Sequence, residues 1–234
     1  MIYDLSQPVF HDAPHWCTYP SIRVTLEHKI AVDGFNAEHV KFTTHSGTHI
    51  DAPFHFVEGA ETVEQLPLDY FVAPALTLDL RAKTPRSRIG AEDLRTALGD
   101  HDVNGCIVLL KTGWGDRRGF TKEFLQQYPY LTGEAAEFLV ERGIKGVGTE
   151  CLSIGGFEPG EGAPAHLALL GAKKLIVEDL QIPDAFLDGN LRWFAAFPIK
   201  LKGASAAWTR AVAWDGEEFP AESLKRIPTQ VRRD

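Results

Sequence analysis

The sequence predicts a single α/β domain, residues 1–234, with a mixed, barrel-like sheet flanked by helices. Three observations support this fold class. A chain of 234 residues with 44% hydrophobic content can bury the core of one large domain. Strand-like and helix-like segments alternate along the middle of the chain, and pairs of strand-like segments lie towards both ends. No repeat, low-complexity segment or linker divides the sequence.

The predicted strands are short segments rich in apolar and β-branched residues. Some of them, such as residues 106–111, are continuous apolar runs, which are typical of strands covered on both faces of a sheet. The segments predicted as strands are residues 22–27, 38–43, 75–80, 106–111, 146–149, 175–178, 195–201 and 206–214.

The predicted helices are recognised by the residues at their boundaries. A threonine before a helix can cap its first N–H groups, and a glycine after it permits the left-handed conformation that ends many helices. The predicted helices and their boundary residues are 91–98 before Gly99, 133–142 between Thr132 and Gly143, and 164–170 before Gly171.

Composition excludes several classes of partner and location. The formal charge of -8 and the lack of a basic stripe argue against nucleic acid and anionic membranes as partners. The three cysteines, Cys17, Cys106 and Cys151, are too few and too widely spaced for a disulfide framework. The first residues lack the basic start and apolar run of a secretion signal, and no apolar stretch reaches the ~20 residues that span a bilayer. We therefore expect a cytoplasmic protein.

Three histidines and one aspartate fall within the eleven residues from His45 to His55. Neutral imidazole and carboxylate groups are the usual protein ligands of zinc and manganese. His45, His49 and Asp51 are the strongest candidate ligands of this run. The alternative is a surface loop whose polar side chains bind water and backbone. His55 has two possible roles, since it could bind a metal ion or take a proton from water beside one. It could also only orient a ligand.

The candidate ligands can meet only if the chain bends between them. An extended chain from His45 to Asp51 would span about 20 Å, whereas bonds to a single ion are about 2 Å long. Gly47 permits a bend, and Pro53 prevents a helix from continuing through the segment. We therefore expect a curled segment.

Two residues further along the chain are weaker candidates on their own. His166 lies in a predicted helix, and Glu178 ends the apolar strand 175–178. A buried glutamate needs a charge partner, and a bound cation would be one. A packed histidine and an exposed strand end are the simpler interpretations of these two residues alone.

The chain resembles the metal-dependent cyclase family, whose members include bacterial kynurenine formamidases and isatin hydrolases. Residues 45–55 match the family signature His-x-Gly-x-His-x-Asp-x-Pro-x-His at every fixed position. Residues 4–8, 59–69 and 109–114 are also similar to family segments, and His166 and Glu178 have the family's separation of twelve positions. The resemblance implies a swivelling β/β/α fold. It also implies a homodimer or homotetramer.

The resemblance assigns roles to individual residues. It implies a divalent metal, Zn²⁺ or Mn²⁺, with one or two ions per subunit, and Asp51 and Glu178 able to bridge a pair. It makes His55 the acid/base residue. Trp16, in a Pro-x-Trp element, would line the substrate pocket, or it could anchor the core. Phe35 is a further aromatic residue expected near an aromatic substrate. The metal ligands that the resemblance implies are His45, His49, Asp51, His166 and Glu178.

The chain departs from the formamidase pattern in residues 146–151. Gly148 replaces an aspartate, Glu150 a proline and Cys151 a serine, while Leu167 stands where a second histidine follows His166. These differences bear on the substrate and leave the predicted metal ligands unchanged. Cys151 could be a nucleophile, but no Cys/His/Asn pattern accompanies it, and a small pocket or core thiol is the favoured interpretation.

The resemblance implies a hydrolase that cleaves an amide C–N bond with metal-activated water. The first expectation for its small-molecule substrate is N-formylkynurenine, cleaved to kynurenine and formate as in tryptophan catabolism. The alternatives are an isatin hydrolase-like or other cyclic amide or lactone hydrolase, and, in another class, a non-catalytic metal-binding protein.

Overall fold

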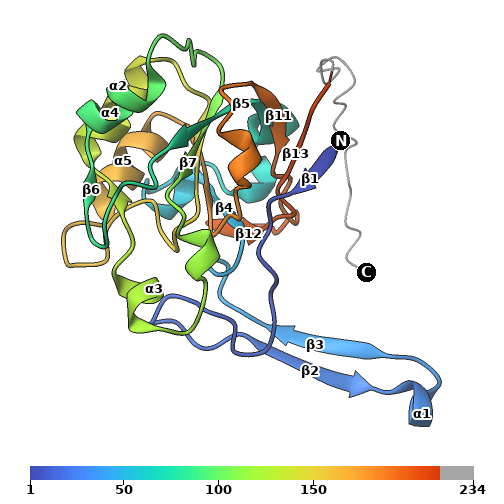
Figure 1. The fold of residues 1–234 in the computed structure, drawn as a ribbon. Coiled ribbons are helices and arrows are strands. Elements are labelled where there is room, and N and C mark those ends of the chain that lie inside the picture. The colour runs from blue at the N-terminus through green and yellow to red at the C-terminus, as the bar shows by residue number, and fades with distance from the viewer. Residues whose placement is uncertain (217–234) are drawn as a thin grey trace.

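A nine-stranded mixed sheet organises residues 1–216, which are the residues that the computed structural model describes. The sheet curls strongly, and helices cover part of it (Figure 1). This confirms the predicted mixed, barrel-like α/β fold; the part of the predicted domain at 217–234 lies outside the described residues. In sheet order the strands are β1 (Ile2–Asp4), β13 (Val212–Trp214), β11 (Arg192–Ala195), β5 (Val72–Asp79), β7 (Ile107–Lys111), β9 (Gly146–Thr149), β10 (Leu175–Glu178), β4 (His49–Asp51) and β12 (Ala206–Trp208).

The centre of the sheet is parallel and its two sides are antiparallel. Strands β5, β7, β9 and β10 run parallel to one another, whereas β4 and β11 pair antiparallel with the outer members of this group. A second small sheet joins β6 (Arg88–Ile89) to β8 (Tyr130–Leu131). The helices are α1 (Ile30–Asp33), α2 (Ala91–Leu98), α3 (Lys122–Gln126), α4 (Gly133–Glu141) and α5 (Ala163–Gly171).

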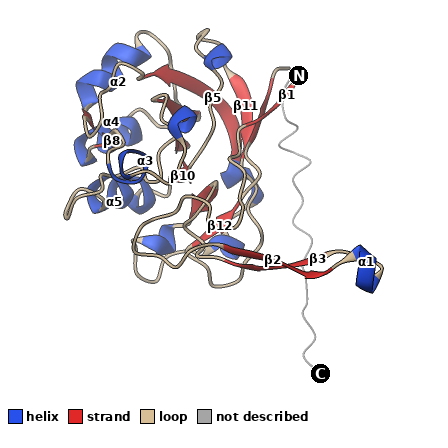
Figure 2. Ribbon diagram, turned by 60° about the horizontal axis from the view of Figure 1, so that its bottom comes forward, coloured by secondary structure: helices blue, strands red, loops and turns tan. Residues whose placement is uncertain are grey.

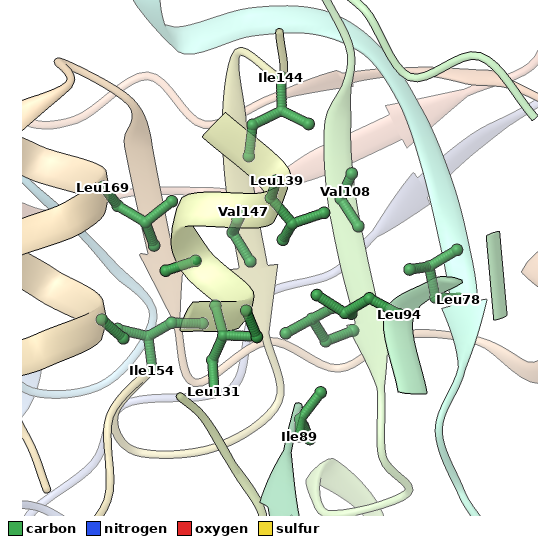
Figure 3. Packing of buried hydrophobic residues seen from close by; sticks show 14 of the residues in the cluster. Leu78, Ile89, Leu94, Val108, Leu131, Leu139, Ile144, Val147, Ile154 and Leu169 are labelled. Atoms are coloured by element: carbon green, nitrogen blue, oxygen red, sulfur yellow. The ribbon is translucent and has the colours of Figure 1, made fainter. Parts of the chain in front are cut away.

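Helices α2, α4 and α5 pack on one face of the parallel strands (Figures 1 and 2). Leu94, Leu139 and Leu169 of these helices are buried in one cluster with Val108 and Val147 of the sheet (Figure 3). A second buried cluster covers the opposite face, where the neighbouring side chains of β7 point. Both faces of the parallel strands are therefore buried, as their continuous apolar sequences predict.

The helix predictions agree with the structure to within one residue at each end. Helix α2 spans the predicted residues, α4 ends one residue early, and α5 is one residue longer at each end. The Thr132 hydroxyl accepts a hydrogen bond from the backbone N–H of Ala135, 3.1 Å away, as expected of a capping residue. No helix within residues 1–216 is both long and apolar enough to cross a membrane.

Two strand predictions near the C-terminal end were wrong in extent. The predicted strand 195–201 corresponds only to the end of β11, and Pro198 just beyond it takes part in an isolated bridge with Thr209. Proline lacks the N–H that a strand ladder requires, so the strand does not continue through it. The predicted strand 206–214 is divided into β12 and β13, because Ala211 turns to pair with Leu5 and Ser6 near the start of the chain. Strand β4 itself was not predicted.

A two-stranded arm projects from the body of the molecule (Figures 1 and 2). It consists of β2 (Arg23–His28) and β3 (Ala37–Lys41), which pair antiparallel, and α1 lies at its tip. These two strands agree closely with the predicted strands 22–27 and 38–43. The arm leaves the body a few residues after Tyr19 and returns to it just before His45, so its base lies beside the predicted metal ligands.

Candidate metal centre

Pairing of β4 with β10 brings two predicted ligands together. In the antiparallel register, His49 lies directly opposite Glu178, the last residue of β10. Asp51 is two residues beyond His49, so its side chain points to the same face of the sheet. The pairing of these two strands cannot be predicted from local sequence, because more than a hundred residues lie between them.

The bend expected before this strand occurs at Gly47, whose backbone has a φ of 63°. A side chain there would be strained, and its Cβ would come within 2.7 Å of a Val9 methyl carbon. The bend carries His45 back over the strand, so that its Nδ1 atom lies 2.9 Å from Asp51 Oδ1. The prediction of a curled segment is therefore confirmed, although residues 49–51 of it form a strand.

The first turn of helix α5 adds His166 to this cluster. Its Nε2 atom is 3.3 Å from Glu178 Oε1 and 3.7 Å from Asp51 Oδ2. The other ring nitrogen, Nδ1, lies 2.7 Å from the backbone oxygen of Gly162. A carbonyl accepts hydrogen bonds, so this contact places a proton on Nδ1 and turns Nε2 towards the carboxylates. A loop leads from β9 to this helix, so His166 comes from a third element of the fold.

His49 is oriented in the same way. Its Nδ1 lies 2.8 Å from the backbone oxygen of Gly47. Its Nε2 lies 3.4 Å from Asp51 Oδ1 and 3.4 Å from Glu178 Oε2. Contacts that fix the tautomer and ring direction of a histidine are typical of metal ligands.

The donor atoms fit a divalent cation. His49 Nε2 and both carboxylate oxygens of Asp51 are buried without a hydrogen-bond partner, which is costly unless another group compensates them. Atoms bound to one ion at about 2.1 Å lie roughly 3–3.5 Å apart, which is close to the separations in this cluster. Imidazole nitrogen and carboxylate oxygen suit both zinc and manganese. All five predicted ligands, His45, His49, Asp51, His166 and Glu178, therefore converge on one buried cluster.

The electrostatics of the cluster also favour a bound cation. Burial raises the pKa of Asp51, but the His45 and His49 imidazoles outweigh burial and hold it well below its usual value. Burial lowers the pKa of His49, but Asp51 and Glu178 outweigh burial and hold it well above its usual value. The buried imidazoles and carboxylates thus favour each other's charged forms, and a bound metal ion would supply positive charge at the same place.

His55 lies at the edge of the cluster. Its ring stacks on that of His45, with centroids 3.8 Å apart, and its ligand atom lies within 4.8 Å of those of His45 and Asp51. Burial lowers the pKa of His55 to about 4, so the imidazole is neutral near pH 7. A neutral imidazole can accept a proton or bind a metal, and both roles predicted for His55 remain compatible with its position.

A cavity of about 200 Å³ opens onto the cluster. Trp16 lines this cavity, and its ring packs against Phe157 with centroids 5.2 Å apart, while its contact with substrate stays a prediction. Phe35 does not line it, because this residue lies in the loop at the end of the arm and is 53% exposed. The sequence did not predict five further lining residues, which are Tyr19, Phe56, Leu152, Ser153 and Gly162. The one indication in the sequence was closeness to predicted residues, since each lies within a few positions of a residue that the motifs identify.

The segment that departs from the formamidase pattern is buried beside the cavity. Glu150 is fully buried, and its carboxylate accepts hydrogen bonds from the backbone N–H groups of Thr112 (2.9 Å) and Gly113 (2.7 Å). The Lys111 ammonium group lies 3.0 Å from it. Burial raises the pKa of Glu150, and Lys111 opposes this shift. Glu150 therefore joins two loops and faces a lysine rather than substrate.

Gly148 and Cys151 have similar structural explanations. A Cβ at Gly148 would come within 2.7 Å of methyl carbons of Leu109 and Leu180, so an aspartate does not fit in this core. Cys151 is buried and unpaired, and burial raises the pKa of its thiol far above the usual value. A thiol that resists ionisation is a poor nucleophile, which supports the prediction of a core thiol.

Comparison with known proteins identifies the family of this chain. Residues 3–155 match the model of the family described as putative cyclase. The chain belongs to the cyclase family. It is 31% identical over 211 residues to the kynurenine formamidase of Bacillus mycoides (strain KBAB4), covering 89% of this chain and 95% of that relative.

Solved structures of cyclase-family proteins have the same fold. A potential metal-dependent hydrolase with cyclase activity superposes with a TM-score of 0.75 at 30% identity, covering 93% of this chain and 99% of that one. Isatin hydrolase A from Labrenzia aggregata, bound to benzyl benzoate, superposes with a TM-score of 0.81 at 25% identity, covering 91% and 93%. The cyclase fold that the resemblance implies is therefore confirmed.

We predict that Lys111→Met destabilises the protein by about 3–5 kcal/mol, because it leaves the Glu150 carboxylate buried without its nearest cation. The double variant Lys111→Met/Glu150→Gln should recover part of this loss, since no buried charge remains. Urea unfolding of the three proteins, followed by tryptophan fluorescence, measures both differences. A loss below about 1 kcal/mol in the single variant would contradict a structural role for this ion pair.

Proposed function

We propose that this protein is a metal-dependent hydrolase that cleaves an amide C–N bond with activated water. The observation that carries the proposal is the buried cluster of imidazoles and carboxylates at the end of an aromatic-lined cavity, in which His49 Nε2 and both carboxylate oxygens of Asp51 lack a hydrogen-bond partner. Relatives named kynurenine formamidase and a structural neighbour named potential metal-dependent hydrolase support it. Because Asp51 belongs to two possible ligand groups, the cluster is compatible with one or two ions, zinc or manganese.

The residues of the site have separate roles in the proposed reaction. His45, His49, Asp51, His166 and Glu178 would hold the ion. When bound, the ion polarises the substrate carbonyl and makes a water molecule more acidic. His55 is neutral near pH 7, so a ring nitrogen can take a proton from that water and return it to the leaving nitrogen. The cavity walls exclude bulk water and orient the substrate.

N-formylkynurenine, cleaved to kynurenine and formate, is the proposed substrate. The indole of Trp16 and the rings of Tyr19 and Phe56 give the cavity the aromatic walls that suit an aryl ring. The alternative is ring opening of an isatin-like cyclic amide or of a lactone, which the neighbouring isatin hydrolase structures favour. Both reactions use the same attack of water on a carbonyl carbon, so the walls of the cavity decide between them.

We propose that this chain associates with further copies of itself as a homodimer or homotetramer. The arm supports this proposal, because Leu26, Phe35 and Val40 are exposed on it and a two-stranded hairpin alone is only marginally stable in water. Similarity to the cyclase family supports a copy of the same chain as the partner. A cytoplasmic location stays a prediction.

We predict that Asp51→Ala and His49→Ala lose metal and activity together, because each removes a ligand from the buried cluster. His55→Ala should keep its metal and lose about 10²–10⁴-fold in kcat, if this imidazole transfers the proton. Metal content by mass spectrometry and initial rates measure the two effects. Full activity in metal-stripped protein would overturn the proposed mechanism. A protein that only binds metal would show no rate to lose.

We predict that an aryl formamide such as N-formylkynurenine is turned over with a higher kcat/KM than isatin or a simple lactone. Absorbance changes of a panel of these compounds measure the ratios directly. Trp16→Ala should raise KM for the aromatic members of the panel more than for an aliphatic lactone, because only the former lose ring contacts. No turnover of any aryl formamide would exclude the formamidase and leave the cyclic substrates.

We predict that the purified protein has a mass of at least two chains by light scattering. Leu26→Lys/Val40→Lys should shift it towards the monomer, because charges replace the apolar residues on one face of the arm. Thr25→Lys, on the other face, is the matched control and should leave the mass unchanged. A monomeric wild-type protein at micromolar concentration would rule out the proposed association.

A further inference from the structure

A further buried carboxylate, that of Asp179, lies directly beside a proposed metal ligand. Asp179 follows Glu178 at the end of β10, and only 1% of it is exposed. Its backbone φ is 55°, in the left-handed region that non-glycine residues rarely adopt. This conformation persists only where the surroundings hold it. Asp179 has no role in the proposed reaction, so its burial and its left-handed backbone conformation have another cause.

The group that holds Asp179 is the guanidinium of Arg118, which lies in the loop after residues 115–117. Arg118 Nε donates to both carboxylate oxygens at 3.1 Å, and Nη2 donates to Oδ2 at 2.9 Å. The side chain of Arg118 is 7% exposed, so solvent screens this pair weakly. A third nitrogen, Nη1, donates to the backbone oxygen of Pro8 at 3.1 Å and fixes the guanidinium to the N-terminal segment.

The backbone of Asp179 connects this ion pair to both metal-binding strands. Its carbonyl oxygen accepts a hydrogen bond of 2.6 Å from the hydroxyl of Thr48, the residue before His49. Its N–H donates to the backbone oxygen of Cys151 at 2.9 Å. The orientation of Asp179 therefore affects the residue on its N-terminal side, Glu178, and, through Thr48, the start of β4.

We propose that Arg118 is a positioning residue for the metal centre. Arg118 binds the Asp179 carboxylate through Nε and Nη2 and so keeps residue 179 in its left-handed conformation. This conformation directs Glu178 to the ion and keeps the Asp179 carbonyl in contact with Thr48, next to His49. Without the guanidinium, a buried and unpaired carboxylate would remain next to Glu178 and would move towards solvent, and the ligand would move with it. The inference rests on the metal centre of the proposed function but not on the reaction or its substrate.

The test compares two buried arginines in EDTA-stripped protein. Arg192 is the matched control, because its side chain is 10% exposed, pairs with Asp188 and Asp215, and lies on β11, four strands away from β10 in the sheet. We expect Arg118→Met to weaken the binding of Zn²⁺ and Mn²⁺ by about 10–100-fold, the range for residues that support metal ligands. Arg192→Met should lower the melting temperature of the metal-free protein but leave both dissociation constants unchanged. Competition with a chromophoric chelator measures the constants.

A second variant separates positioning from stability. In Arg118→Met/Asp179→Gly the buried charge is gone, and glycine adopts a φ of 55° without strain. We expect this double variant to bind metal within a few-fold of the wild-type protein, although the ion pair is absent. It also serves as the test protein if Arg118→Met does not fold.

Three results overturn the inference. One is a folded Arg118→Met variant with wild-type metal affinity, and another is an Arg192→Met variant with the same loss of affinity as Arg118→Met. The third is a double variant that binds metal as weakly as Arg118→Met. A wild-type protein that binds neither ion would instead refute the metal centre itself, so the two failures are distinguishable.

Discussion

The structure of this protein depends on the burial of charged and ionisable side chains in one cluster. Asp51 and Glu178 lie within a few ångströms of the His45, His49 and His166 imidazoles, and none of the five reaches far into solvent. Two buried carboxylates cannot stay ionised without compensation, because the cost of desolvation is large. The neighbouring imidazoles offset part of this cost, and a divalent cation held by the same side chains would offset it as well. The surrounding fold can be understood as the frame that this cluster requires.

That frame combines rigid and irregular parts. The parallel strands, buried on both faces, hold β10 in place, and the antiparallel pairing of β4 sets His49 opposite Glu178. The irregular parts then direct the side chains. Gly47 bends the chain, and backbone carbonyls fix the rings of His49 and His166. Asp179 adds a left-handed residue at the strand end, held by Arg118. A left-handed backbone at a non-glycine residue persists only where its surroundings hold it, as they do at Asp179.

The departures from the formamidase pattern have structural consequences more than catalytic ones. Glu150 serves as an acceptor for two backbone N–H groups and as the partner of Lys111. Gly148 is required by the methyl groups of Leu109 and Leu180. The residues that reach the cavity from this region are Leu152 and Ser153, directly after the altered segment. Differences of substrate among relatives are therefore to be sought in these two residues and in Trp16, Tyr19 and Phe56.

The sequence by itself determined the local elements and the chemistry. Helix boundaries depend on capping residues such as Thr132, and strands depend on apolar runs. Both are local properties of the sequence. Residues 45–55 can be recognised as candidate metal ligands from their residue types alone. The resemblance supplied His166 and Glu178, which periodicity and spacing alone did not support. Only the tertiary structure decided the register of β4 on β10, the split of residues 206–214 and the pairing of Arg118 with Asp179. These features join residues far apart in the chain, so their energies depend on contacts that no local pattern encodes.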